Sequence, residues 1–351
     1  MRCLLLLALA SSTWAADIPK PSGSPKVIHP QGQLELLFTR SAPIEGGLTE
    51  GPAAAPDGSI YFSDIPFGDD KGMILRFDPA ANKVSVFSED SGKSNGLIFD
   101  AQGRMLACEG AAHGGRRISR WDVKTKQRET IVDRYQGKHF NSPNDICLDR
   151  QGRIYFTDPR YVGHEPRELE HRAVYRIDLD GSTHELTHEV SKPNGVVVSP
   201  DGEKIYVTDT DNGTDAIEKI DPDNPPRRGA MKIYEFPLNA KGEVSGPRKV
   251  FYDFGERFGC DGMTVDSSGR IYLTCREPTR PGVMVMNPQG KEIAFIPTGP
   301  ADQKVAKGES PVGLPSNVEF GIRKGKRWLY ITVDKSLYRI RLKAKGFHAQ
   351  Y

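Results

Sequence analysis

Short runs of β-type residues, rather than long amphipathic segments, carry the hydrophobic pattern of this chain. The stretch from Phe140 to Pro159 shows this most clearly. It begins with a polar group at Asn141 to Asp145, continues with an alternating run at 146–149, and turns at 150–152 into the β-rich run RIYFT. Two such runs joined by a turn that contains glycine predict a β-hairpin.

The same layout occurs six times along the chain. Each unit has a leading polar residue, a short β-like run, a turn with glycine and a second β-rich run. The second runs read SIYFSD, RMLACEG, RIYFTD, KIYVTD, RIYLTC and RWLYITV. The leading polar residues are Glu50, Asn95, Asn144, Asn194, Asp261 and Asn317.

The spacing of these units predicts the fold. The turn glycine lies 8 positions after the polar residue in all six units, and successive polar residues are 45, 49, 50, 67 and 56 positions apart. A period of roughly 40–50 residues with several strands per unit is typical of a β-propeller. Further β-type runs at 73–77, 117–121, 173–177 and 282–286 would complete the blades. We therefore predict an all-β protein, a six-bladed β-propeller with four-stranded blades, whose Asp- and Pro-rich insertion at 211–228 is an extended loop.

The first residues of the chain predict an exported protein. A short positive start is followed by an apolar core at Leu4 to Ala10 and by small residues up to Ala16. This order is typical of a cleavable signal peptide, which we place at residues 1–15. The apolar core is too short to span a bilayer, and no later run is long enough to do so. We expect a secreted or periplasmic protein without a membrane partner.

The rest of the chain is predicted to have two parts. Residues 16–33 contain several prolines and few apolar residues, which indicates an extended N-terminal lead-in. The propeller is expected to span residues 34–351, with its first strand at Leu34 to Phe38.

Composition narrows the function further. The 351 residues include 36 Gly and 26 Pro, which suits a fold with many turns, and 48 basic against 46 acidic residues leave a net charge of +2. The basic runs at 323–327 and 341–345 are short and fit a solvated strand face better than a nucleic-acid patch. We expect no nucleic-acid partner, and the sequence does not specify an oligomeric state.

Four cysteines follow the signal peptide, and two of them suggest a pairing. Cys260 and Cys275 flank one predicted hairpin and could lie opposite each other. An oxidising compartment would permit a disulfide there, but both positions also suit small buried hydrophobes. The spacing of the four cysteines matches no metal site.

The repeated polar residues predict a site. In a propeller the innermost strand of each blade faces a central channel, so the six leading residues should converge at one mouth of that channel. They offer two carboxylates and four amides, and none is His or Cys. An oxygen-only set suits a hard cation, Ca²⁺ above all. A single Asn-Gly or Asp-Gly is usually only a turn, but a structural repeat does not require such a residue at the same phase each time.

Other motifs give no competing site. The segment at 209–215 resembles the start of an EF-hand loop, but its fifth position is Gly213 and its twelfth is Ile220, so we interpret it as a plain loop. The histidines have no HExxH spacing, and the chain has no GxSxG, so a serine hydrolase triad has no support.

Several motifs at the repeated positions are shared with one known family. They are EGP at 50–52, NSPND at 141–145, FTDP at 156–159, KPNGVVVSPD at 192–201, CDGMTVD at 260–266 and NVEFG at 317–321. On these motifs, residues 35–342 resemble the gluconolactonase / senescence marker protein (regucalcin) family, and most closely its bacterial gluconolactonase branch. The resemblance implies a metal-dependent propeller hydrolase that opens a small sugar lactone to the aldonic acid.

The resemblance also implies roles for single residues. The family's divalent metal site, carried over motif by motif, would use Glu50, Asn144, Asn194 and Asp261, with Ca²⁺ as the expected ion and Zn²⁺ or Mg²⁺ as alternatives. Asp261 would also be the catalytic acid/base. Asn144 would contact substrate as well, and the repeat adds Asn95 and Asn317 as substrate-binding residues at the mouth. Animal members carry an Arg two residues before the substrate-contacting Asn, where this chain has Ser142, so recognition by that Arg is not implied.

Two other functions remain open from the sequence. One is a related propeller phosphotriesterase or arylesterase, because the same metal would suit a phosphoester. The other is a non-catalytic propeller that binds a sugar or a protein through its face.

Overall fold

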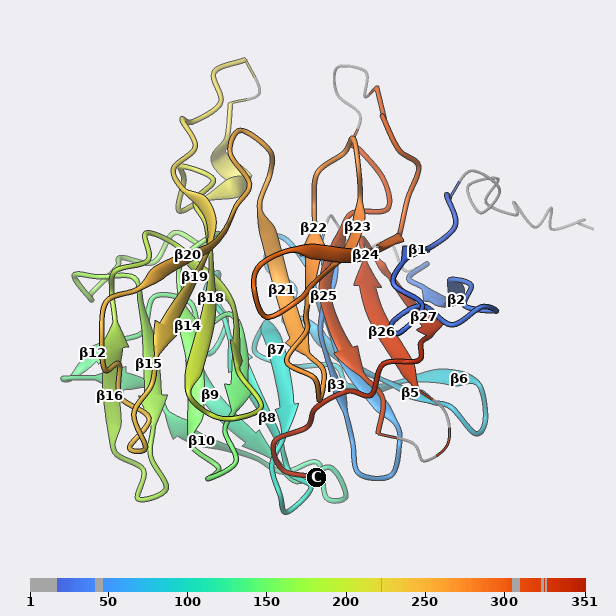
Figure 1. The fold of residues 1–351 in the computed structure, drawn as a ribbon. Helices are drawn as coiled ribbons and strands as arrows, with labels where there is room; N and C mark the ends of the chain where they lie inside the picture. The colour runs from blue at the N-terminus through green and yellow to red at the C-terminus, as the bar shows by residue number, and fades with distance from the viewer. Residues whose placement is uncertain (1–17, 42–46, 222, 305–309, 323–324, 326) are drawn as a thin grey trace, which may run out of the picture.

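Six antiparallel sheets stand around a central channel in the computed structural model, which describes residues 18–351 except 42–46, 222, 305–309, 323–324 and 326 (Figure 1). The predicted signal peptide lies outside the described residues. The prediction of a six-bladed propeller with four-stranded blades is confirmed. No helix among the described residues has the length and apolar character needed to cross a membrane.

The blades follow one another in chain order, each built from the channel outward. Blade one contains β3 (Leu48–Ala54), β4 (Ile60–Ile65), β5 (Met73–Asp78) and β6 (Lys83–Ser88). Blade two contains β7 (Ser94–Phe99), β8 (Met105–Glu109), β9 (Arg117–Trp121) and β10 (Arg128–Val132). Blade three contains β13 (Ile146–Leu148), β14 (Ile154–Asp158), β15 (Ala173–Ile177) and β16 (Thr183–Thr187). Blade four contains β17 (Pro193–Val198), β18 (Lys204–Thr210), β19 (Met231–Pro237) and β20 (Lys249–Asp253). Blade five contains β21 (Cys260–Val265), β22 (Ile271–Cys275), β23 (Gly282–Met286) and β24 (Glu292–Pro297). Blade six contains β25 (Pro315–Phe320), β26 (Trp328–Val333), β27 (Ser336–Arg341) and β2 (Glu35–Thr39).

The N-terminal part of the described chain contributes to two blades. The strand β2 is the outer strand of blade six, where it pairs with β27 and closes the ring. Part of the predicted lead-in is also attached to the ring, because the short strand β1 (Ser22–Gly23) pairs with β24 as a fifth strand of blade five. Outside the blades are the small hairpin of β11 (Arg134–Tyr135) and β12 (Lys138–His139), and the 3₁₀ turn η2 (Ile217–Lys219) in the predicted insertion.

The hydrophobic core lies between neighbouring blades. Second strands are buried on both faces, which explains why runs such as RIYFTD are apolar without alternation. On β14, Tyr155 packs toward blade four with Ile205, while Phe156 packs toward blade two with Leu106. The four cysteines described are buried free thiols, and Cys260 lies opposite Cys275 in the β21–β22 pairing.

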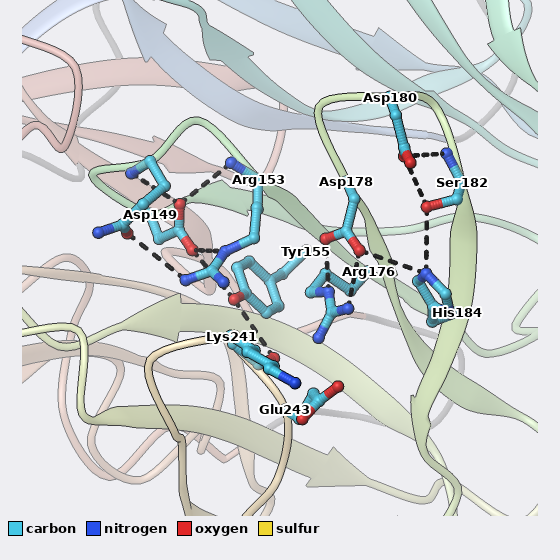
Figure 2. Close-up of polar contacts among 12 residues, drawn as sticks. Asp149, Arg153, Tyr155, Arg176, Asp178, Asp180, Ser182, His184, Lys241 and Glu243 are labelled. Carbon is cyan, nitrogen blue, oxygen red and sulfur yellow. Dashed lines mark hydrogen bonds and ion pairs between the residues drawn. The ribbon is translucent and has the colours of Figure 1, made fainter.

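A local ionic network fixes the hairpin turn after the innermost strand, here called the channel strand, in blades three and five. In blade three the Asp149 carboxylate accepts hydrogen bonds from the backbone of Arg153 (3.0 Å), its Nε (2.6 Å) and the Tyr155 hydroxyl (3.0 Å) (Figure 2). Asp266 does the same in blade five for Arg270 (3.1 and 2.6 Å) and the Tyr272 hydroxyl (3.0 Å). The turn glycines of all six blades have φ between 73° and 88°, a conformation that favours glycine. We call this end of the propeller the turn end and the opposite end the mouth.

The C-terminal segment crosses the turn end (Figure 1). The Phe347 N–H donates to the carbonyl of Val265 (3.1 Å). Residues 347–351 line a cavity there together with Glu319 and the ends of the channel strands. Burial raises the pKa of Glu319 to about 8 and lowers the pKa of His348 to about 4.

Candidate functional site at the mouth

Irregular strand pairing at the start of the channel strands sets the direction of the repeated polar side chains. In five blades the pairing of the first two strands shifts register beside that residue, as between Glu50 and Ala53 and between Cys260 and Met263. In blade three regular pairing begins only at Ile146, after Asn144. A bulge bends a strand and re-aims its side chains, so side chains that would alternate between blade interfaces instead point along the channel.

Hydroxyl groups tie three of the polar residues to the preceding blade. Thr157 Oγ1 on β14 donates to the Asn194 carbonyl (2.7 Å), and Thr208 Oγ1 on β18 reaches the Asp261 carbonyl (3.3 Å). Ser63 Oγ does the same for the Asn95 carbonyl (2.8 Å). The Ser or Thr in the repeated FSD, FTD and VTD runs is therefore a positioning group for the next blade's polar residue.

The glycine after Asp261 is needed for close packing rather than for a turn. A Cβ at Gly262 would lie 2.1 Å from Cγ of Asn317, so the Asn317 amide lies directly against the Gly262 backbone. The Asp-Gly pair is thus part of a channel strand, and its glycine lets the next blade approach.

The mouth contains an open cavity of roughly 970 Å³, counting the solvent-filled space between its walls. Five of the six repeated polar residues line it: Glu50, Asn95, Asn144, Asn194 and Asp261. Within the described part of the chain, the side-chain amides of Asn95 and Asn144 make no hydrogen bond with protein, which leaves them available to a ligand.

The sixth residue, Asn317, lies below the cavity and does not line it. Its Nδ2 donates to Oδ1 of Asp145 (3.3 Å), whose Oδ2 accepts from the Val196 N–H (3.2 Å). Asn317 therefore supports the floor of the site, in contrast to the substrate contact expected from the repeat. Burial raises the pKa of Asp145 to about 7.

Asp261 is held by two side chains. Its Oδ1 accepts a hydrogen bond from Nδ2 of Asn194 (2.7 Å), and its Oδ2 lies 3.4 Å from Nη1 of Arg276. These contacts fix the direction of the carboxylate. Burial raises the pKa of Asp261, while Arg276 and Asn194 oppose that rise.

Glu50 is 3% exposed and faces the same cavity. Its Oε2 accepts a hydrogen bond from the Gly51 N–H (3.1 Å). Burial raises the pKa of Glu50 well above its usual range, and the neighbouring Asp261 raises it further. Two neighbouring carboxylates, of which one has an arginine 3.4 Å away, make a site that a divalent cation would stabilise.

The donor set fits a hard divalent cation. Glu50, Asn144, Asn194 and Asp261 share one cavity wall and offer carboxylate and amide oxygens. The charge of Asp261 raises the pKa of Glu50, so a cation bound near both carboxylates would be favoured, in agreement with the residue types.

The sequence interpretation did not include Arg276 or Asp145. Arg276 directly follows the RIYLTC run, at the phase where Ile65 and Thr210 follow the corresponding runs, and all three line the cavity. The same repeat could therefore have indicated it. Asp145 carries no comparable signal, because its neighbour Asn144 already filled the repeated position.

Loops outside the repeat form the roof of the cavity. Tyr161 donates its hydroxyl to the Thr210 carbonyl (3.0 Å), and the buried ammonium of Lys192 lies 4.2 Å from the centre of the Tyr161 ring. Lys192 also contacts Asn212 Oδ1 and the Thr214 carbonyl in the segment that resembled an EF-hand loop. That segment is thus held to the roof by a lysine. Burial lowers the pKa of Lys192 to about 8.

Comparison with known proteins places this chain among lactonases. The family described as SMP-30/Gluconolactonase/LRE-like region matches residues 48–334. A gluconolactonase of Zymomonas mobilis is 28% identical over 345 residues, which cover 90% of this chain and 85% of that protein.

Two solved structures share the fold. The structure of a gluconolactonase from Xanthomonas campestris superposes with a TM-score of 0.71 and 27% identity, over 93% of this chain and 96% of that one. The calcium-binding protein regucalcin from Agrobacterium tumefaciens has a TM-score of 0.65 and 17% identity, over 90% of this chain and 96% of that one.

Proposed function

The chain belongs to the SMP-30/gluconolactonase/LRE-like family and is a lactonase, and we propose that it opens sugar lactones to aldonic acids with a divalent cation, Ca²⁺, held at the mouth. The observation that carries this proposal is a pair of carboxylates, the buried Glu50 and the partly buried Asp261, which line one cavity and of which Asp261 raises the pKa of Glu50.

Glu50, Asn144, Asn194 and Asp261 would hold the cation. When bound, it would supply a Lewis acid for the lactone carbonyl and offset charge on the tetrahedral intermediate. The Arg276 guanidinium lines the same cavity and would supply a second positive group near the reacting oxygen.

Asp261 is the proposed acid/base. Its Oδ1 is oriented by Asn194, and Oδ2 faces Arg276 at 3.4 Å. A water molecule attacks the carbonyl carbon and gives its proton to Asp261, which passes it to the ring oxygen as the carbon–oxygen bond breaks. The products are the open acid and a hydroxyl group, with no further reactant.

Asn95 and Asn144 would contact the substrate. Their amides face the cavity without a protein partner among the described residues, so each can bind a hydroxyl or the ring oxygen of a lactone. Ser142 lines the cavity and its Oγ accepts a hydrogen bond from the Ala111 N–H (2.9 Å), but it has no positive charge with which to replace an arginine.

The test is lactone hydrolysis measured with a pH indicator on glucono-1,5-lactone and a panel of aldonolactones. We expect turnover that disappears on chelation, returns with added Ca²⁺ and is lost in Asp261→Ala. Calcium at a hundredfold excess over its Kd should also raise the free energy of unfolding by ~2.7 kcal/mol, and Glu50→Gln should abolish that rise. Turnover unaffected by chelation would contradict the role of the cation.

The apolar wall of the cavity favours a second candidate, a propeller arylesterase or phosphotriesterase. Phe67, Val162, Ile217 and Phe258 are the apolar residues of this wall. Such a wall suits an aromatic or alkyl group as well as the apolar face of a sugar ring. Hydrolysis of phenyl acetate or paraoxon with inert aldonolactones would favour this candidate, and bound Ca²⁺ without turnover of any ester would favour a binding propeller.

The predicted signal peptide at residues 1–15 supports a location outside the cytoplasm. We expect the mature protein to begin near Ala16 and to be recovered from the periplasm or the medium. N-terminal sequencing of the fractionated protein tests this, and an intact Met1 on cytoplasmic protein would contradict it.

A further inference from the structure

Two histidines and a glutamate meet at the rim of blade three, far from any sequence motif. The ligand atoms of His171, Glu185 and His188 all lie within 4.8 Å of one another. The fold brings them together because His171 precedes β15, while Glu185 and His188 lie on and just after β16. None of the three is among the described residues that line the mouth cavity.

The geometry of the cluster converges on one point. His188 Nδ1 lies 2.6 Å from Oε1 of Glu185, and His171 Nδ1 lies 3.8 Å from the same oxygen. The two imidazole rings are stacked, with centroids 4.0 Å apart and an interplanar angle of 22°. Both Nδ1 atoms therefore approach one carboxylate oxygen, with which His188 shares a hydrogen bond.

The backbone that carries these side chains is fixed. The His171 carbonyl accepts a hydrogen bond from Nδ2 of the buried Asn141 (3.0 Å). Glu185 pairs with Tyr175 directly beside a register shift between Val174 and Tyr175. The three side chains are therefore carried by backbone that strand pairing and hydrogen bonding hold in place.

From this geometry we infer that His171, Glu185 and His188 form a second cation site, suited to Zn²⁺. Two imidazoles and a carboxylate are the ligand types of zinc sites that keep one position for water. The side chains are 40%, 23% and 52% exposed, respectively, so a hydrated ion can enter and a water can complete the coordination.

A further carboxylate lies near the cluster. Oε1 of the exposed Glu170 is 3.8 Å from Nε2 of His171, which is beyond hydrogen-bond distance. The mouth offers only oxygen donors, so the two sites select different cations.

Zinc here would join the segment before β15 to the end of β16, the two outer strands of blade three. The site is independent of the proposed lactonase chemistry, and it would act on the stability of this blade. A zinc-dependent rise in thermal stability should therefore persist when the mouth is disabled.

The experiment is equilibrium dialysis of the full chain against ZnCl₂ in excess Ca²⁺, followed by metal analysis. The mouth variant Glu50→Gln/Asp261→Asn should retain one zinc ion per chain, and His171→Ala/His188→Ala should bind zinc more than about tenfold more weakly. His184→Ala is the matched control, because this histidine lies on the same strand but contacts Asp178 at 3.2 Å. Imidazole ¹H–¹⁵N correlation spectra should show zinc shifts at Nδ1 of both ligating histidines.

The outcomes separate cleanly. Zinc retained by the His171→Ala/His188→Ala variant, or zinc lost in the mouth variant, would overturn the inference. Absence of zinc binding by the wild type would overturn it as well. Because lactone hydrolysis is not a readout here, failure of this proposal leaves the proposed function untouched.

Discussion

The two ends of the propeller use carboxylates in opposite ways. At the turn end, Asp266 meets Arg270, a tyrosine hydroxyl and backbone N–H groups that all lie within six positions of it. At the mouth, Glu50 and Asp261 come from different blades and face each other, with Arg276 as the nearby cation. One arrangement is local and satisfied, whereas the other is assembled from distant blades and strained.

The difference separates stability from function. A satisfied local network stabilises each hairpin without help from its neighbours. A strained pair of buried carboxylates costs folding free energy unless a ligand relieves it. Substitutions at the two ends should therefore have opposite effects on stability and activity.

The largest effect is expected from Asp261→Asn. Loss of the acid/base should lower kcat on a lactone by ~10²–10⁴-fold. The free energy of unfolding of the metal-free protein should stay the same or rise, because the repulsion with Glu50 is removed. Steady-state kinetics and urea unfolding measure both, and a variant with normal kcat would contradict the role given to Asp261.

Asp266→Ala should give the reverse pattern. It leaves the buried end of Arg270 and the Tyr272 hydroxyl without their acceptor, which should lower the free energy of unfolding by ~3–5 kcal/mol. Activity per folded molecule should be unchanged. Asp57→Ala is the control, because this exposed carboxylate pairs with Arg76 at 3.2 Å and should cost less than ~1 kcal/mol. Equal losses in the two variants would be inconsistent with the ionic network.

Glu319 at the turn-end cavity gives a pH test. Its folded pKa is raised from 4.5 to about 8, so the folded chain keeps a proton that the unfolded chain releases. Its contribution to stability is present below about pH 4.5 and is lost as pH rises toward about 8. Glu319→Gln should remove that loss and gain on the order of 2 kcal/mol relative to wild type at pH 8. Parallel stability curves for the two proteins between pH 5 and about 8 would contradict this.

The smallest effect is expected from Thr157→Val. The hydroxyl donates to the Asn194 carbonyl and accepts from the Asp145 N–H (3.0 Å). Its loss should cost ~1–2 kcal/mol and should lower kcat a few-fold through a displaced Asn194. Thr187→Val, on the outer strand of the same blade, should change stability by less than ~0.5 kcal/mol. If kcat is unchanged in Thr157→Val, the hydroxyl has only a structural role.

The repeat made much of the fold predictable. Strands β9, β15 and β23 begin and end at the predicted residues, because each blade repeats the same hairpin and turn chemistry. The channel strands place five predicted polar side chains around one cavity for the same reason.

Features that depend on how neighbouring blades pack were harder to predict from the sequence. Asn317 has the right phase, but its strand lies where the amide meets Gly262 and Asp145 rather than the cavity. Tyr161 and Ile217 belong to loops of unequal length, which carry no repeat from which a position could be inferred. His171 and His188 are joined only by the pairing of two outer strands.

The ring is closed by the pairing of β2 with β27, and these two strands are synthesised at different times. Glu35 on β2 forms an ion pair with Arg339 on β27, 304 positions later. During synthesis β2 therefore stays unpaired until every blade has been made. The outer edge of β27 also stays unpaired until β2 pairs with it. A chain that stops short of β27 cannot close the circle that brings blade one, with Glu50, beside blade six. The mouth therefore forms only after the ring of six blades has closed, so an incompletely synthesised chain lacks the site.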